Sequence, residues 1–209
     1  MGNLVKSPVQ VLDLGHFTGG RRGRYDFFSL FKECGSLAVR PPPMHPSDFA
    51  TILEEKSFTS KKADCETVAA LYRRAFEMRV GKAKVLPFGE LKWGDAEMEM
   101  LSRVLNEAAS CELLILSGNS IGDGGLATLA GALREGAAMK LTQLIIDGNR
   151  YGNEGVAALA ACLRDGAAPN LKRVSMCDNP RVSSSQSKWL SDAREGLEVL
   201  MKDDPVVSS

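Results

Sequence analysis

Few side chains in this 209-residue chain have the type and spacing that catalytic chemistry requires. The only two histidines, His16 and His45, have no nucleophile partner at a motif spacing, so the sequence does not indicate a nucleophile–base pair. The five cysteines form no C-x-x-C pair, which argues against a zinc site or a disulfide framework and favours reduced thiols in a cytosolic protein. They are Cys34, Cys65, Cys111, Cys162 and Cys177.

The carboxylates and the glycine-rich stretches do not indicate catalysis either. Six glutamates fall on the expected solvent faces of helices and turns and form no isolated inward pair for acid–base work. No glycine-rich loop ends in Gly-Lys-Ser, so a nucleotide cradle is absent from the sequence. We therefore expect a non-enzyme with no catalytic residue, no metal and no cofactor. The glutamates are Glu97, Glu99, Glu107, Glu112, Glu135 and Glu154.

Composition narrows the classes of partner. The 26 basic and 26 acidic side chains give a formal net charge of +0, and aromatic residues make up 6%, so nucleic-acid binding is not expected. No run of about 18 apolar residues exists, which argues against stable membrane insertion. With no apolar stretch of signal-peptide type at the start, we expect a cytoplasmic protein.

Three short motifs leave other kinds of binding open. RPPPMHP, residues 40–46, is either a polyproline docking peptide or a solvated linker. GGRRGR, residues 19–24, is either a phosphate-binding stretch or a flexible loop. Gly2 is a possible lipidation site, but the myristoylation pattern requires Ser or Thr where Lys6 stands, and one acyl chain anchors only marginally.

The second half of the chain contains an internal repeat, which must position whatever site the protein has. Residues 114–143 and 144–173 align without gaps at a period of 30, with 15 identical positions. Asn119, Asn149 and Asn179 keep this period, and an earlier unit beginning near Val85 aligns at a shift of 28. A unit of this kind cannot bury its apolar face alone, so neighbouring units must stack.

Each unit joins a strand pattern to a helix pattern. Leu114 and Leu116 alternate with Ile115 as on a strand. Helical spacing follows at Leu126, Leu129, Ala130 and Leu133. The expected helix N-caps are Asp95, Asp123 and Asn153, and the expected left-handed C-terminal residues are Gly136 and Gly166.

These residues resemble the leucine-rich repeat, in its ribonuclease-inhibitor-like class, over about residues 84–183. The resemblance implies an α/β fold: a short solenoid with parallel strands on the concave side and helices on the convex side. It also implies that Asn119, Asn149 and Asn179 form a structural ladder, bonding backbone groups of adjacent turns, and that Leu91 takes this place in the first unit. The residues that carry the match in one unit are Leu141, Leu144, Ile146, Asn149, Tyr151 and Gly152.

The flanks are expected to close the two ends of the solenoid. We predict an irregular, partly helical segment over residues 1–60, a repeat domain over residues 61–202 and a flexible tail over residues 203–209. A capping helix is predicted at 64–80, with Val68, Leu71, Ala75 and Met78 on its inner face. A second capping helix is predicted at 186–202, where Trp189 covers the core or, alternatively, serves as a binding anchor.

Strand alternation predicts the binding surface. If Leu114 and Leu116 point into the core, the odd-numbered neighbours point onto the concave face and form an apolar strip with a polar rim, as in interaction sites. Two alternatives remain: β-branched residues simply suit strands, or residues 1–60 cover the strip. The predicted binding residues are Leu113, Ile115, Ser117, Gln143, Ile145, Asp147, Arg173 and Ser175.

The sequence thus favours a non-catalytic adaptor or scaffold that binds another protein, of unknown identity, through this face. We expect a monomer or weak oligomer. One alternative is a regulator of a small GTPase or other signalling enzyme, by analogy with longer proteins of this repeat class, and it would use Arg150 or Arg181. Another is a membrane-tethered adaptor acylated at Gly2.

Overall fold

The structure of the chain is a computed structural model that describes residues 40–55 and 63–201, which belong to one compact unit spanning Ala38–Ser209. The predictions for Gly2, for GGRRGR and for the tail at 203–209 fall outside the described residues. Residues 40–55 belong to the same compact unit as the repeats.

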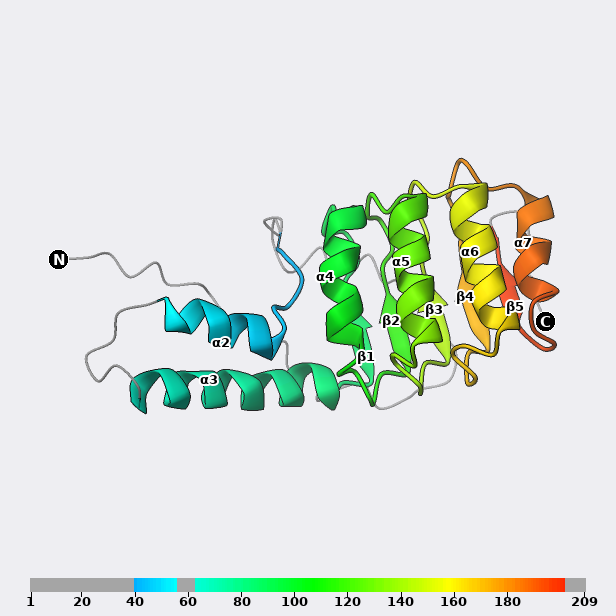
Figure 1. Cartoon of the computed structure of the whole chain (residues 1–209). Coiled ribbons are helices and arrows are strands. Elements are labelled where there is room, and N and C mark those ends of the chain that lie inside the picture. The colour runs from blue at the N-terminus through cyan, green and yellow to red at the C-terminus, as the bar shows by residue number, and fades with distance from the viewer. Residues whose placement is uncertain (1–39, 56–62, 202–209) are drawn as a thin grey trace, which may run out of the picture. The chain divides into compact units, whose positions relative to one another are not determined.

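Five parallel strands form one sheet in sequence order (Figure 1). Equivalent core positions of the repeat align across it, so that Leu86 pairs with Leu114, Leu114 with Leu144, and Leu144 with Val174. The strands therefore stack one repeat on the next. They are β1 (Val85–Pro87), β2 (Leu113–Ile115), β3 (Gln143–Ile145), β4 (Arg173–Ser175) and β5 (Glu198–Leu200).

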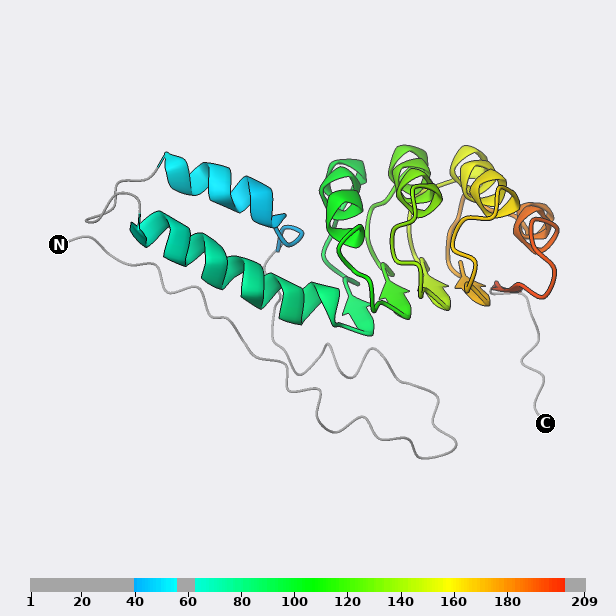
Figure 2. The same cartoon turned by 60° about the horizontal axis from the view of Figure 1, so that its bottom comes forward.

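A helix follows each of the first four strands, and these helices all lie on one side of the sheet (Figures 1 and 2). The core fills the space between the layers, with Leu114, Leu116 and Leu144 from strand segments and Leu129 from a helix almost fully buried. The arrangement fits a solenoid-like repeat of strand and helix. The helices are α4 (Asp95–Leu105), α5 (Asp123–Arg134), α6 (Asn153–Arg164) and α7 (Ser184–Ser191).

The helix ends agree with the sequence at one terminus and differ at the other. Gly136 and Gly166 adopt positive φ values of 94° and 88°, as a helix C-terminus of this kind requires. Asp95 and Asp123, however, are not the N-caps of their own helices, since Gly94 and Gly122 hold those positions. Asn153 likewise follows an N-cap glycine, Gly152.

The two aspartates instead cap the helix of the following repeat. Asp95 Oδ1 accepts from Gly122 N at 2.7 Å, and Asp123 Oδ1 accepts from Gly152 N at 2.7 Å and from Gly155 N at 2.8 Å. A Cβ on Gly155 would stand only 3.0 Å from Asp123 Oδ1, so this position admits no side chain without a shift. The sequence carried the signal in the paired Asp and Gly positions of successive units, but the partner lies one repeat away.

The N-terminal described segment forms a pair of helices beside the first repeat. Helix α2 (Pro46–Glu54) lies against α3 (Ala63–Phe76), and the π-helical turn η1 (Glu77–Gly81) continues α3 toward β1 (Figures 1 and 2). Phe49 stacks on Tyr72 with ring centroids 3.9 Å apart. Helix α2 falls within residues 1–60, for which a partly helical segment was expected.

The predicted inner face of the 64–80 helix is wrong. Leu71 is 63% exposed and Met78 is 59% exposed, whereas Phe76 and Val80 belong to the core. The aromatic side chains decide the orientation, because Tyr72 stacks on α2 while Phe76 joins the repeat core. The predicted inner face, built on aliphatic residues, is therefore rotated from the observed one by roughly one residue, or about 100° around the helix axis.

The single helix predicted at 186–202 is also wrong. Helix α7 ends at Ser191, Gly196 adopts a positive φ of 77°, and β5 then adds a fifth strand in which Val199 pairs with Val174. The alternation from Leu197 to Val199 was the signal for a strand. Trp189, predicted to point inward, is 41% exposed, and Leu190 is the buried residue of α7.

Candidate protein-binding face

The face of the sheet turned away from the helices, called here the open face, carries the odd-numbered positions of strands β1 to β4 and of the residues just after them. None of these side chains belongs to the core cluster, which takes Leu114, Leu116, Leu144, Ile146 and Val174 from the same segments. The structure thus places the predicted binding residues on one surface. They are Leu113, Ile115, Ser117, Gln143, Ile145, Asp147, Arg173 and Ser175.

The exposure of this row is uneven. Ile115 is only 1% exposed, although it was predicted to be open to a partner; Pro87 and Ile145 stand beside it in register on the flanking strands. Ser175 is 8% exposed, and its hydroxyl bonds to Asp147. Ile145 and Asp147 are partly exposed, so β3 presents the accessible apolar and charged groups of the row side by side.

Asp147 is the centre of a small polar network at the carboxyl end of β3. Its Oδ1 atom accepts from Ser175 Oγ at 2.7 Å and from Cys177 N at 2.8 Å. Desolvation by burial raises the pKa of Asp147, and the negative charge of Asp178 raises it further, against the lowering effect of the two hydrogen bonds. The carboxylate is therefore held in one orientation while its charge remains poorly compensated.

The opposite edge of the open face carries paired charges. Arg173 Nε lies 2.7 Å from Glu198 Oε2, and Lys84 Nζ lies 3.0 Å from Glu112 Oε1. A shallow cavity of about 310 Å³ opens at this edge between β3, β4 and β5. Its lining residues are Thr142, Gln143, Lys172, Arg173 and Glu198.

The three repeated asparagines lie buried behind the carboxyl ends of the strands and join adjacent turns. Asn119 Oδ1 accepts from Leu91 N and Trp93 N, each at 3.0 Å, across the first pair of repeats. Asn149 Nδ2 donates to Leu116 O at 3.0 Å, which links the second pair. The amides therefore fix the turns that carry the open-face loops.

The third turn of this series uses a tyrosine as well. Asn179 Oδ1 accepts from Asn149 N at 2.7 Å, and Asn179 Nδ2 donates to the hydroxyl of Tyr151 at 2.7 Å. That hydroxyl in turn donates to Ile146 O at 3.1 Å, and burial raises the pKa of Tyr151 far above its ordinary value. Among the described residues, no buried side-chain polar atom lacks a hydrogen-bond partner.

Arg150 and Arg181, the residues of the GTPase alternative, lie in neighbouring turns before α6 and α7. Arg181 Nη1 donates to Arg150 O at 3.0 Å, and Arg181 Nη2 stands 3.4 Å from Asp123 Oδ2. Arg181 is therefore already bound to its own chain, and Arg150 remains exposed.

The described cysteines are free thiols, and three of them, Cys111, Cys162 and Cys177, lie in the repeats. Burial raises the pKa of Cys111 to about 11, and burial also raises the pKa of Cys177 despite its contact with Ser175 Oγ at 3.8 Å. Both thiols therefore stay protonated near neutral pH, which is the opposite of what a nucleophile needs.

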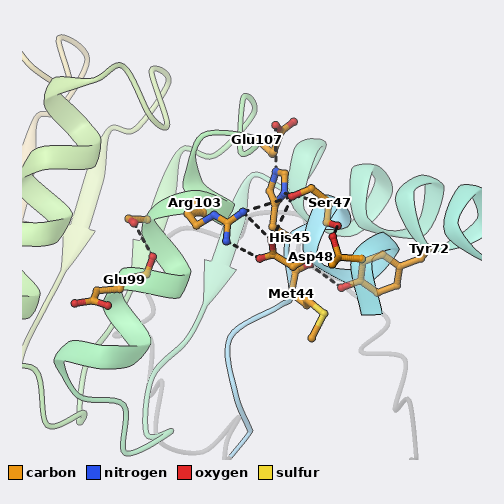
Figure 3. Close-up of polar contacts among 10 residues, drawn as sticks. Met44, His45, Ser47, Asp48, Tyr72, Glu99, Arg103 and Glu107 are labelled. Carbon is orange, nitrogen blue, oxygen red and sulfur yellow. Dashed lines mark hydrogen bonds and ion pairs between the residues drawn. The ribbon is translucent and has the colours of Figure 1, made fainter. Parts of the chain in front are cut away.

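Sequence reasoning missed a second polar cluster, which holds residues 40–48 against the first repeat (Figure 3). The Arg103 guanidinium on α4 contacts both carboxylate oxygens of Asp48, at 2.7 and 2.8 Å. His45 Nε2 lies 3.6 Å from Glu107 Oε1, and His45 Nδ1 accepts from Ser47 N at 3.3 Å at the start of α2. The contacts with Arg103 and Glu107 span 55 or more residues of sequence, so no local pattern could have revealed them.

The polyproline stretch lies on the protein, which argues against the solvated-linker alternative. Pro42 is buried, Arg40 O accepts from Trp93 Nε1 at 2.6 Å, and Met44 O accepts from Tyr72 Oη at 2.7 Å. These contacts place residues 40–45 between the first repeat and the pair of helices α2 and α3. In this position the stretch has its own chain as a partner.

No helix in the described part of the chain is long and apolar enough to cross a membrane. No protein-family model matches the chain, and no curated protein matches it. Solved structures do match, among them one described as leiomodin-1 actin-binding site 2, with a TM-score of 0.52 and 12% identity over 63% of this chain and 78% of that chain. At this identity the likeness shows the fold alone: a parallel sheet with helices, which fits the leucine-rich repeat that the sequence resembles.

Proposed function

We propose that the chain is a non-catalytic protein-binding module of the ribonuclease-inhibitor-like leucine-rich-repeat class, acting as an adaptor or scaffold in the cytoplasm. The observation that carries the proposal is the open face of β3, where Ile145 and Asp147 stand partly exposed on a rigid sheet. Protein-recognition surfaces usually have an apolar centre with a polar rim, and Ile145 with Asp147 beside it fits this arrangement. The raised pKa values of Cys111 and Cys177 also argue against a thiol enzyme.

The fold likeness suggests a first partner to test. The similar solved structure is described as an actin-binding site, so actin is the partner with which the experiment begins. The chain would be mixed with monomeric actin in a pull-down and with filaments in a co-sedimentation assay, and an unbiased affinity capture followed by mass spectrometry would run in parallel.

Ile145→Arg is the decisive variant. It places charge and bulk on the open face without entering the core, so we expect a folded protein that loses its partner. Met139→Arg is the matched control, because Met139 is 48% exposed after α5 and lies off the open face. If Ile145→Arg retains every partner that the unmodified chain captures, the proposed function is wrong.

The two alternatives stay predictions. The small-GTPase reading predicts that added protein changes the rate of GTP hydrolysis and that Arg150→Ala removes this effect. The membrane-tethered reading predicts an acylated Gly2, which mass spectrometry of the native N-terminus detects.

A further inference from the structure

The open face carries one carboxylate whose charge is not matched within the described residues. Asp147 forms no ion pair among them, whereas Arg173 on the next strand is paired with Glu198 at 2.7 Å. Both described hydrogen bonds of the Asp147 side chain end on Oδ1, from Ser175 and Cys177. The second oxygen, Oδ2, takes no hydrogen bond in the described part of the chain, although its orientation is fixed by the bonds to Oδ1.

The position of this carboxylate beside Ile145 sets a spacing. The two residues are two positions apart along the β3 segment and share the open face, so their side chains lie about 6.6 Å apart along the strand direction. Alternate side chains of an extended segment have the same spacing. An extended partner segment lying along β3 could therefore place one side chain on Ile145 and the side chain two positions away, which points the same way, on Asp147.

Resting on the proposed function, we propose that the partner presents an extended segment with an arginine or lysine two positions from an aliphatic residue. Asp147 binds the cation, and the aliphatic side chain lies on Ile145. A cation at Oδ2 would match a charge that is desolvated in the free protein and held in place by Ser175. Charge-assisted hydrogen bonds of this kind are roughly twice as strong as neutral ones. An acidic or neutral segment would leave the same carboxylate desolvated and unmatched.

The test pans a display library of random short peptides on the full chain and measures the affinity of synthetic copies of the enriched sequences. We expect arginine or lysine two positions from isoleucine, leucine or valine. Asp147→Asn keeps an acceptor for Ser175 and Cys177 but removes the charge, so it should weaken these peptides at least about tenfold, the size expected for a lost charged hydrogen bond. The affinity for the unmodified chain should fall as salt is added.

Two further variants separate the outcomes. Asp192→Asn removes the same charge from an exposed position at the end of α7 and should leave the affinity unchanged. Two results would overturn this inference and leave the proposed function standing. In the first, Ile145→Arg abolishes the binding of the enriched peptides, but these peptides lack a basic residue. In the second, the peptides bind Asp147→Asn as well as they bind the unmodified chain. A library that yields no enriched peptide, or peptides insensitive to Ile145→Arg, would overturn both.

Discussion

Asn149 shows how one buried amide holds two repeats together. Its Nδ2 donates to Leu116 O and Ile146 O, each at 3.0 Å, and its Oδ1 accepts from Ile121 N at 3.1 Å. Asn149→Ala would leave these backbone groups buried without a partner. Because each unsatisfied buried group costs about 1–3 kcal/mol, we expect a loss of about 2–4 kcal/mol in the free energy of unfolding, measured by urea denaturation.

Asn106→Ala is the control for this measurement. Asn106 is exposed at the end of α4, so its replacement should change the free energy of unfolding by less than about 0.5 kcal/mol. Equal effects of the two substitutions would show that the buried amide does not join the repeats.

The Asp147 carboxylate gives a pH-dependent prediction. Its pKa is raised in the folded protein, so the folded state holds the proton more tightly than the unfolded state does. The stability of the unmodified chain therefore falls as pH rises from the unfolded pKa through the folded pKa. Asp147→Asn should be more stable than the unmodified chain at neutral pH, and the difference should vanish in acid, below the unfolded pKa.

Thermal denaturation across this pH range measures the difference. If Asp147→Asn is less stable than the unmodified chain at neutral pH, the charge is stabilised in the folded protein and no partner cation is needed to match it. Binding and stability thus make opposite demands on the Asp147 side chain.

The elements differ in how far the sequence could predict them. The repeats could be predicted because strand and helix patterns recur at a fixed period, so each unit supported the assignment of the others. The 64–80 helix and the 186–202 segment occur once, and a single amphipathic pattern does not distinguish the face of Leu71 from that of Phe76. The open-face row followed from alternation, but alternation assigns a side chain only to a face of the sheet and does not give the 1% exposure of Ile115.

The contact between α2 and α4 rests on one exposed ion pair and can be tested by removing it. The Arg103–Asp48 pair is about half exposed, so it should contribute only about 0.2–1 kcal/mol and weaken in salt. Arg103→Ala should therefore leave the repeats folded while it increases amide hydrogen exchange in α2 and α3. Hydrogen-exchange mass spectrometry measures each element separately.

The matched control uses an ion pair within the repeats. Arg134 and Asp165 are exposed to a similar degree and lie 2.9 Å apart, but they join the ends of α5 and α6. Arg134→Ala should leave exchange in α2 unchanged. If both variants change α2 equally, the Arg103 pair is not what holds these helices.

For the whole described molecule, one core cluster runs from Phe76 to Leu197 without a break. The two tryptophans stand in its first and last repeats: Trp93 is 1% exposed and Trp189 is 41% exposed. In a Trp189→Phe variant, Trp93 fluorescence reports the first repeat alone, while circular dichroism reports all helices. We expect the two urea midpoints to coincide, since stacked repeats this few in number should unfold as one cooperative unit.

Separate midpoints would show that the first repeat unfolds independently of the rest. In that case the ladder of asparagines would join the turns without coupling their unfolding. The same variant also shows whether Trp189, at its exposed position, contributes to partner capture.

The aspartates that cap the following helix make each repeat depend on the one before it. Asp123 belongs to one unit, and the amides of Gly152 and Gly155 belong to the next. A duplication that copies a whole period reproduces both the acceptor and its glycines, whereas an insertion of any other length separates them. Such an array can therefore lengthen during evolution only in steps of one full period, and its first unit must begin without a capping aspartate from upstream.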